Sequence, residues 1–147
     1  MWKTILKMEA KMEKSKIELI KEFIETCPLL KNGKVNVDYI KDKPQSYSID
    51  ETPSITILAR FADGGTRNQI LFDFSIQANF SVLENIKNSK FCDDFTNWIK
   101  EQEKIGNLPQ IDGICWIRCT GRGTILQTTE TTAIYVIPMQ VVYDEDF

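Results

Sequence analysis

Two neighbouring segments in which apolar and polar side chains alternate constrain the fold of this chain more than any other feature. The segments are residues 55–61 and residues 69–80. A period of two is typical of a β-strand with one buried face. Between the segments lies Asp63-Gly64-Gly65-Thr66, and glycine readily adopts the positive φ that a tight hairpin turn needs. We therefore predict one long, half-buried β-hairpin.

Two other segments have apolar residues at spacings of three and four, which is typical of amphipathic helices. The first, residues 2–26, contains no glycine or proline and ends before Pro28. The second spans residues 85–104, with its main part starting near Asp93, and Gly106 is placed to end it. We expect both helices to cover the apolar face of the hairpin.

Shorter alternating segments complete the predicted sheet. They are residues 35–39, 47–49, 114–120 and 132–143, whereas residues 121–129 are expected to form a polar, Thr-rich loop. Because proline cannot donate to a β-ladder, Pro138 is expected at an edge or a bulge. The order of elements predicts an α+β fold: a mostly antiparallel sheet with a long β-hairpin and helices packed on one face. No repeat or change of composition divides the chain, so residues 1–147, helix 2–26 included, are expected to form a single domain.

The charge balance argues against specific nucleic-acid binding. The net charge is −3, and the 18 basic residues are spread along the chain rather than clustered. No segment approaches the ~20 apolar residues of a membrane span. Lys3, Lys7 and Glu9 interrupt any apolar core of a signal peptide. We expect no membrane partner and a protein that stays in the cytosol unless it leaves within a larger particle.

The nucleophile systems and metal sites that use histidine are excluded, because the chain contains no histidine. Even spacing in a strand predicts that Cys115 and Cys119 share one face. A zinc site requires closer cysteine pairs and two further ligands. We therefore expect Cys27, Cys92 and this pair to be reduced, packed thiols, with no metal and no cofactor.

The glycine and acidic motifs do not predict an active site. Gly64-Gly65 and Gly121-x-Gly123 are too short for a phosphate-binding loop and lack the Gly-Lys-Ser/Thr that follows one. The acidic pairs are close neighbours in sequence, and neighbours do not converge on a substrate across a cleft. These pairs are Asp50-Glu51, Asp93-Asp94 and Asp144-x-Asp146. We do not expect an enzyme.

The polar positions of the hairpin leave two interpretations open. Arg60, Gln69, Asp73 and Gln77 are predicted to face away from the helices. They form either an exposed sheet face with cross-strand pairs or a face that packs on another subunit. Trp98 and Trp116 are expected to pack in the core.

Several short pieces, taken in order, resemble one phage family. They are Val37-Asp38-Tyr39-Ile40, then the segment from Tyr47 to Pro53, the Asp63-Gly64-Gly65 turn, Phe95-x-x-Trp98-Ile99, Asn107-Leu108-Pro109, and the segment from Thr131 to Met139 with Val142-Tyr143. In this order and spacing the chain resembles the small tail-terminator or minor capsid proteins of tailed phages and phage-tail-like bacteriocins.

The resemblance implies a structural role. Tail terminators form a ring, usually a hexamer, on the head-proximal end of the tail tube, where the ring stops polymerisation and offers a docking face to the connector or collar. The implied partners are further copies of the chain, the tail tube protein, and the head-side connector or collar. The implied location is the host cytoplasm and then the virion or phage-tail-like particle. The loops expected to touch axial neighbours comprise Asp63, Gly64, Gly65, Thr66, Arg67, Gly121, Arg122, Gly123 and Thr124.

Two alternatives remain beside the terminator. One is another head–tail connector or minor capsid component, which would bind the portal side. The other is a soluble adaptor or binding module with the same fold, which would present a pocket rather than a ring.

Overall fold

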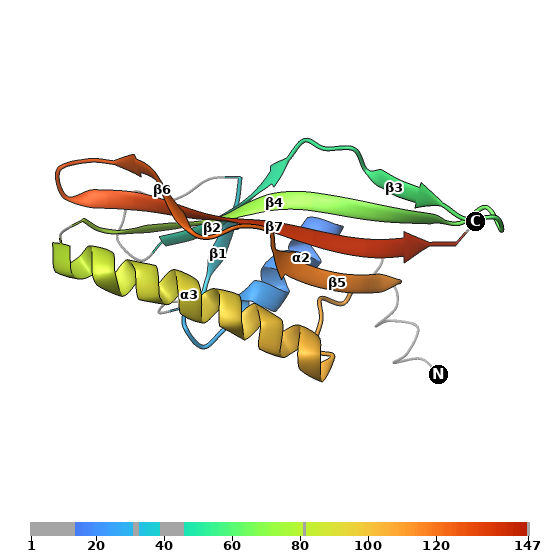
Figure 1. The fold of residues 1–147 in the computed structure, drawn as a ribbon, viewed down its shortest axis with the longest axis horizontal. Coiled ribbons are helices and arrows are strands. Elements are labelled where there is room, and N and C mark those ends of the chain that lie inside the picture. Colours follow the sequence, from blue (N-terminus) through green and yellow to red (C-terminus); the bar gives the residue numbers. More distant parts are fainter. Residues whose placement is uncertain (1–13, 31–32, 39–45, 81, 147) are drawn as a thin grey trace.

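The computed structural model describes residues 14–30, 33–38, 46–80 and 82–146. Within them, helices α2 (Lys16–Glu25) and α3 (Val82–Ile105) lie on one side of a seven-stranded mixed sheet (Figure 1). The strands are β1 (Val35–Val37), β2 (Ser46–Thr52), β3 (Ile57–Arg60), β4 (Thr66–Asn79), β5 (Ile114–Cys119), β6 (Thr124–Thr128) and β7 (Thr132–Glu145). The predicted α+β fold, a mostly antiparallel sheet with helices on one face, is confirmed.

The two longest strands, β4 and β7, form the centre of the sheet. They pair antiparallel over their whole lengths, from Thr66 opposite Glu145 to Asn79 opposite Thr132. Along its other edge β4 pairs with β2 and β3, and β7 pairs in the same way with β5 and β6. The predicted hairpin of β3 and β4 therefore exists but is short, because the long partner of β4 is β7. That partner matches β4 with an alternating apolar face of its own.

Aromatic side chains join α3 to the sheet. Phe95 stacks on Phe74 of β4, with ring centroids 4.5 Å apart, and Phe91 lies 6.2 Å from Tyr47 of β2. Phe74 and Phe95 are fully buried. The helix is continuous from Val82, earlier than the predicted start near Asp93, and its end at Gly106 (φ 79°) agrees with the prediction. The side of the sheet that α3 covers is thus the apolar side, and the opposite side is called the far face below.

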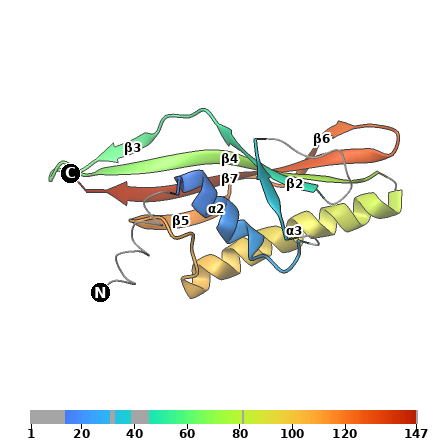
Figure 2. The ribbon, with the colours of Figure 1, turned by 180° about the vertical axis from the view of Figure 1, so that it is seen from behind.

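The first described helix is shorter than predicted. Ser15 has an extended backbone (φ −67°, ψ 159°), and its side chain accepts a hydrogen bond from the Glu18 N–H, so α2 begins at Lys16. Ser15 and Glu18 have the spacing of a capping box, a start signal that the helical periodicity hides. The prediction of one helix over 2–26 is therefore wrong at Ser15, and residues 2–13 lie outside the described part. Figure 2 shows α2 on the same side of the sheet as α3. The two helices are in contact there, with the ring centroids of Phe23 and Trp98 5.3 Å apart.

Pro138 occupies a central strand, not the predicted edge. Its carbonyl accepts a hydrogen bond from the Thr120 N–H at 2.8 Å, where the chain passes from β5 to β6. Since the N and O of one strand residue point the same way, the missing N–H of Pro138 faces this gap between the two outer strands. Gly121 fits closely there, because a Cβ on it would stand 3.0 Å from Pro138 Cγ. Because no strand residue lies opposite the proline nitrogen in this gap, no hydrogen bond is lost there. The gap therefore has the effect that was expected of a bulge or an edge.

Candidate assembly surface

The first predicted contact loop lies at one end of the sheet. Residues 63–65 lie in the turn from β3 to β4, and Thr66 and Arg67 begin β4, next to the end of β7 (Figure 1). Gly64 has a φ of 93°, and the Phe61 N–H donates to the Gly65 carbonyl at 2.8 Å. The predicted hairpin turn is therefore confirmed at this position.

The second predicted contact loop lies apart from the first. Gly121 to Thr124 connect β5 to β6 in the middle of the sheet, and a Cβ on Gly123 would stand 2.6 Å from Cys92 Sγ of α3. Gly123 thus packs against α3, whereas Gly121, Arg122 and Thr124 are exposed. The structure does not bring the two predicted loops together at one end of the molecule.

The four residues predicted to share the polar sheet face also separate. Gln69, Asp73 and Gln77 alternate along the far face of β4, but Gln77 is only 5% exposed. Arg60 pairs with Thr66, which lies on the helix side of β4, because a bulge between Ile57 and Ala59 shifts the alternation of β3. The expected common face therefore excludes Arg60, and Gln77 is not available on the surface.

Gln69 belongs to a polar ladder that crosses the far face. Its Nε2 donates to the Ile55 carbonyl at 2.8 Å, and its Oε1 accepts from Gln140 Nε2 of β7 at 2.9 Å. Gln140 Oε1 in turn accepts from Trp116 Nε1 of β5 at 3.2 Å. Trp116 is half-buried on this far face, so the prediction that it packs in the core is wrong. The ladder holds the segment before β3 to three strands of the sheet.

An ion pair between Arg67 and Asp144 lies beside this ladder. Arg67 donates to Asp144 through Nε at 2.8 Å and Nη2 at 3.0 Å, a bidentate pair between β4 and β7. The Cζ atom of Arg67 also lies 5.7 Å from the centroid of the Phe61 ring and 5.9 Å from the centroid of the Trp116 ring. The hydrogen bonds from Arg67, together with its charge, hold the pKa of Asp144 below its ordinary value. Arg67, predicted as an axial contact, is therefore paired within its own subunit, beside Phe61 of the segment that leads out of β3.

The four cysteines do not form a metal site in the described residues. A bulge between Ile114 and Trp116 separates the predicted pair, so Cys115 lies beside Arg67 and Asp144 while Cys119 lies near Thr96 of α3. Burial raises the pKa of Cys92 to about 11. All four thiols are free, and no group of three or more potential metal ligands occurs among the residues that the structure describes.

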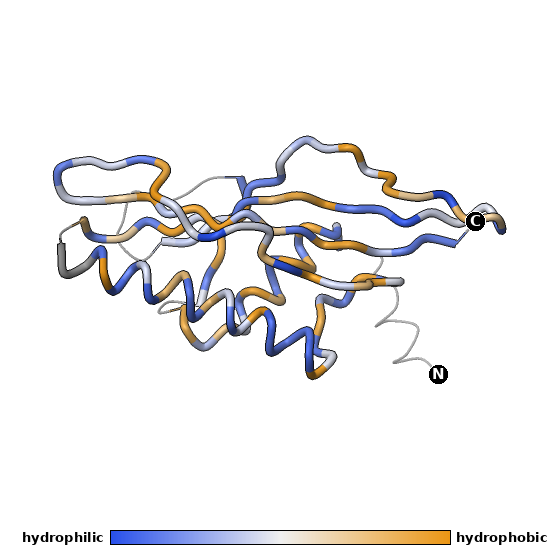
Figure 3. Tube along the Cα trace, viewed as in Figure 1, coloured by the Kyte–Doolittle hydropathy of each residue, from blue (hydrophilic) through white to orange (hydrophobic). Residues whose placement is uncertain are grey.

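The largest exposed apolar features are two short strands. Every residue of β3 and every residue of β6 is exposed. We call residues 55–61 the β3 arm and residues 124–130 the β6 arm. The β3 arm carries Ile55, Ile57, Leu58 and Phe61, and the β6 arm carries Ile125 and Leu126. The arms lie at opposite ends of the sheet (Figure 1), and Figure 3 shows the hydrophobic positions along the β3 arm.

The β6 arm replaces the Thr-rich loop predicted over residues 121–129. Ile125 pairs with Tyr135 and Thr128 with Ala133, so most of this segment is a strand on the edge of β7. The sequence Thr-Ile-Leu-Gln-Thr-Thr is rich in β-branched residues, a signal for a strand that its lack of alternation obscures. A bulge between Ile125 and Gln127 accounts for that missing alternation.

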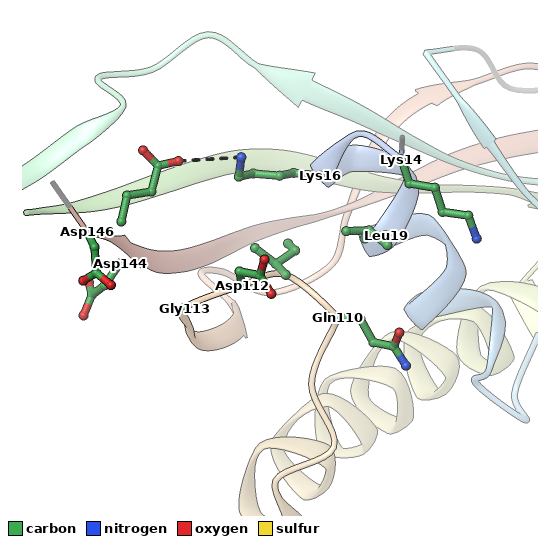
Figure 4. Close-up of a pocket in the computed structure, with 10 residues that line it drawn as sticks. Lys14, Lys16, Leu19, Gln110, Asp112, Gly113, Asp144 and Asp146 are labelled. Carbon is green, nitrogen blue, oxygen red and sulfur yellow. Dashed lines mark ion pairs between the residues drawn. The ribbon is translucent and has the colours of Figure 1, made fainter. Parts of the chain in front are cut away.

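One groove on the surface has most of its charges already paired. It encloses about 530 Å³ between the start of α2 and the ends of β5 and β7 (Figure 4). Lys16 lies 3.7 Å from Glu145, and Lys14 is paired with Glu22 at 2.6 Å. Asp144, also on the groove wall, is held by Arg67. The groove thus lacks a free, converging set of catalytic groups among the described residues.

Two comparisons with known proteins find no relative of this chain. A scan against protein-family models finds no match, and a search of curated proteins also finds none. Among the described residues, no helix combines the length and the apolar character needed to cross a bilayer.

Proposed function

We propose that this chain is a structural assembly protein that forms a ring at the head-proximal end of a phage or phage-like tail. The ring stops polymerisation of the tail tube and offers a docking face to the connector or collar. The observation that carries this proposal is the pair of exposed apolar arms at opposite ends of one sheet. Edge strands of this kind promote pairing between chains, and a monomer that functions alone gains nothing from two of them.

The placement of the arms favours a ring over a simple two-fold dimer. In a two-fold dimer the same surface meets itself, whereas in a ring one surface meets a different surface of the next subunit. Two separate arms on one subunit supply two such surfaces. The buried core between them, centred on Phe74 and Phe95, gives each subunit a rigid frame.

The arms also suggest how the ring meets its axial neighbours. Asp63 and Gly64 are exposed in the turn at one end of the sheet, and residues 128–131 form an exposed turn at the opposite end (Figure 1). We expect these end turns, rather than the 121–123 turn in the middle of the sheet, to reach the tube or the connector. The proposed role requires no catalysis and no cofactor.

Solution mass and imaging on tail tubes test this function. We expect purified protein to assemble into rings, either in solution at rising concentration or on the ends of purified tail tubes, as seen by negative-stain electron microscopy. A protein that stays monomeric and ignores tubes would contradict the proposal and favour the soluble adaptor. Binding to portal particles instead of tubes would favour the head–tail connector.

A further inference from the structure

The edges of β3 and β6 differ from the other outer edges of the sheet. β1 and β5 also border it, but β1 lies against α2 and β5 against α3. β3 pairs with β4 and β6 pairs with β7, and no further described strand lies beyond either of them. An uncovered edge strand presents a row of unpaired backbone N–H and C=O groups that a second strand can satisfy. The fold thus offers two vacant edges per subunit.

The side chains on these edges are complementary in both character and charge. Leu58 is 46% exposed and Leu126 is 70% exposed, so each edge presents a large apolar side chain to solvent. Arg60 follows Leu58 on the β3 arm, and Glu130 follows Leu126 on the β6 arm. Neither Arg60 nor Glu130 has an ion-pair partner among the described residues. One edge therefore carries a free positive charge and the other a free negative charge.

We propose that the outer edge of β3 in one copy of this chain pairs with the outer edge of β6 in a second copy. The strands run parallel, with Leu58 beside Leu126. In that direction Arg60 lies opposite Thr128, at the end of β6 that leads into the turn carrying Glu130, so the two charges come to the same end of the contact. Antiparallel pairing at the same leucines would place the two charges at opposite ends of the contact. This inference rests on the proposed function and specifies which surfaces hold the ring together.

The contact is self-propagating because β3 and β6 lie at opposite ends of the same sheet. Each copy donates its β3 edge to one neighbour and its β6 edge to the other, which generates a ring when the rotation closes. A single pairing of four or five residues is short, so each contact is weak by itself. Closure strengthens the assembly, since the last subunit to enter gains two contacts at once. The expected behaviour is a sharp, concentration-dependent step from monomer to ring.

Two single-edge variants test this pairing directly. Leu58→Lys blocks the β3 edge, and Leu126→Lys blocks the β6 edge. Each variant alone is expected to remain monomeric, because every contact in a population of that variant includes a blocked edge. In an equimolar mixture one intact β3 edge meets one intact β6 edge, so a heterodimer is expected, at concentrations above those at which the wild type closes its ring because it has only one contact. Ile105→Lys, at an exposed apolar position on α3 (63%) between Leu58 and Leu126 in exposure, is the matched control and should assemble as the wild type does.

The assembly state is read by native mass spectrometry in solution and by labelled subunits on purified tail tubes. Circular dichroism verifies that every variant is folded. Wild-type rings, monomeric single variants and a heterodimer in the mixture would support the pairing. Assembly of either single variant as in the wild type, or a mixture that stays monomeric at the highest concentration that both variants reach in solution while the wild type assembles, would overturn it without affecting the proposed function.

Other outcomes separate the pairing from the proposed function. A wild type that assembles with this pattern but ignores tail tubes would contradict the function and leave the pairing intact. A wild type that is monomeric both in solution and on tubes would overturn both.

Charge reversal tests the direction of the strands. Arg60→Glu and Glu130→Arg are each expected to raise the concentration needed for assembly by about tenfold, an effect within the range of a charge contact at an interface. The double variant Arg60→Glu/Glu130→Arg is expected to recover most of the loss. A double variant as weak as either single variant would exclude the parallel arrangement. Lys104→Glu, a change of the same sign on α3 away from both arms, provides the control for net charge.

Discussion

Each of the two central strands has a covered partner and an uncovered partner along the same edge. On β4, Tyr47 and Ile49 of β2 are 1% and 0% exposed, whereas every residue of β3 is exposed. On β7, Ile117 of β5 is fully buried, whereas every residue of β6 is exposed. The helices cover β2 and β5 and leave β3 and β6 in solvent. The core that stabilises the subunit and the edges available for assembly are thus separate regions of one sheet.

This separation implies that the two regions tolerate substitution differently. Truncation of a side chain buried under the helices leaves a cavity, and the lost contacts lower the free energy of unfolding. A change on an arm alters a surface that is already hydrated, and its effect on a free monomer is small. Substitutions in the core and on the arms therefore measure this difference.

Truncation of a core aromatic should have the largest effect. Phe74→Ala removes a fully buried ring that stacks on Phe95 and lies 6.0 Å from Tyr47. We expect a loss of about 3–5 kcal/mol in the free energy of unfolding, measured by urea denaturation. Leu58→Ala, on the β3 arm, should change it by about 0.5 kcal/mol or less. Equal losses at the two positions would mean that the arm is part of the cooperative core.

Two glycines with positive φ should respond unequally to alanine. Gly113 (φ 75°) precedes β5, and an added Cβ would overlap the Asp144 carbonyl, whereas Gly106 (φ 79°) has open space around it. We expect Gly113→Ala to cost about 3 kcal/mol, because both backbone strain and steric overlap apply. Gly106→Ala should cost about 1 kcal/mol from strain alone. Thermal unfolding measures both, and similar costs would show that the end of β5 moves aside without penalty.

The elements of this fold were easier to predict than their pairing. The alternation in β4 and β7, the helical spacing around Phe95 and the glycine turn at Gly64 are local signals, and the structure contains each of these elements. The choice of β7 as the long partner of β4 depends on residues far apart in the chain. Nothing in the alternation of β4 itself distinguishes a near partner from a distant one.

Bulges account for most of the errors at the candidate surface. β3, β5 and β6 each contain one, and each bulge moves the following side chains to the other face. For that reason Arg60 does not share the far face with Gln69, and Cys115 does not share a face with Cys119. A single extra residue has no local sequence signature, so the period-two pattern predicts the strand but not which face its second half presents.

Two aspartates on β4 and β7 should respond to pH with opposite signs. Asp73 lies where β4 borders β2, and burial together with the nearby Asp50 raises its pKa. Asp144 lies where β7 borders the part of β4 that carries β3, and its pKa is lowered by Arg67. The lowered pKa of Asp144 stabilises the fold above the ordinary carboxylate pKa, and this contribution is lost as the pH falls through the lowered value. The raised pKa of Asp73 does the reverse, so its cost is full at neutral pH and absent in acid.

Asparagine substitutions measure these two contributions. At neutral pH, Asp144→Asn should lower the melting temperature and Asp73→Asn should raise it, each by a few degrees at most, because both side chains are partly solvated. Asp73→Asn should match the wild type once the pH is below the ordinary carboxylate pKa of about 4, because the raised pKa keeps Asp73 protonated there. Asp144→Asn should do so only at lower pH, after the pH has fallen through the lowered pKa of Asp144. Melting curves followed by circular dichroism at neutral and acidic pH provide the measurement. A melting temperature that Asp144→Asn leaves unchanged at neutral pH would show that the ion pair with Arg67 adds no measurable stability to the pairing of β4 with β7.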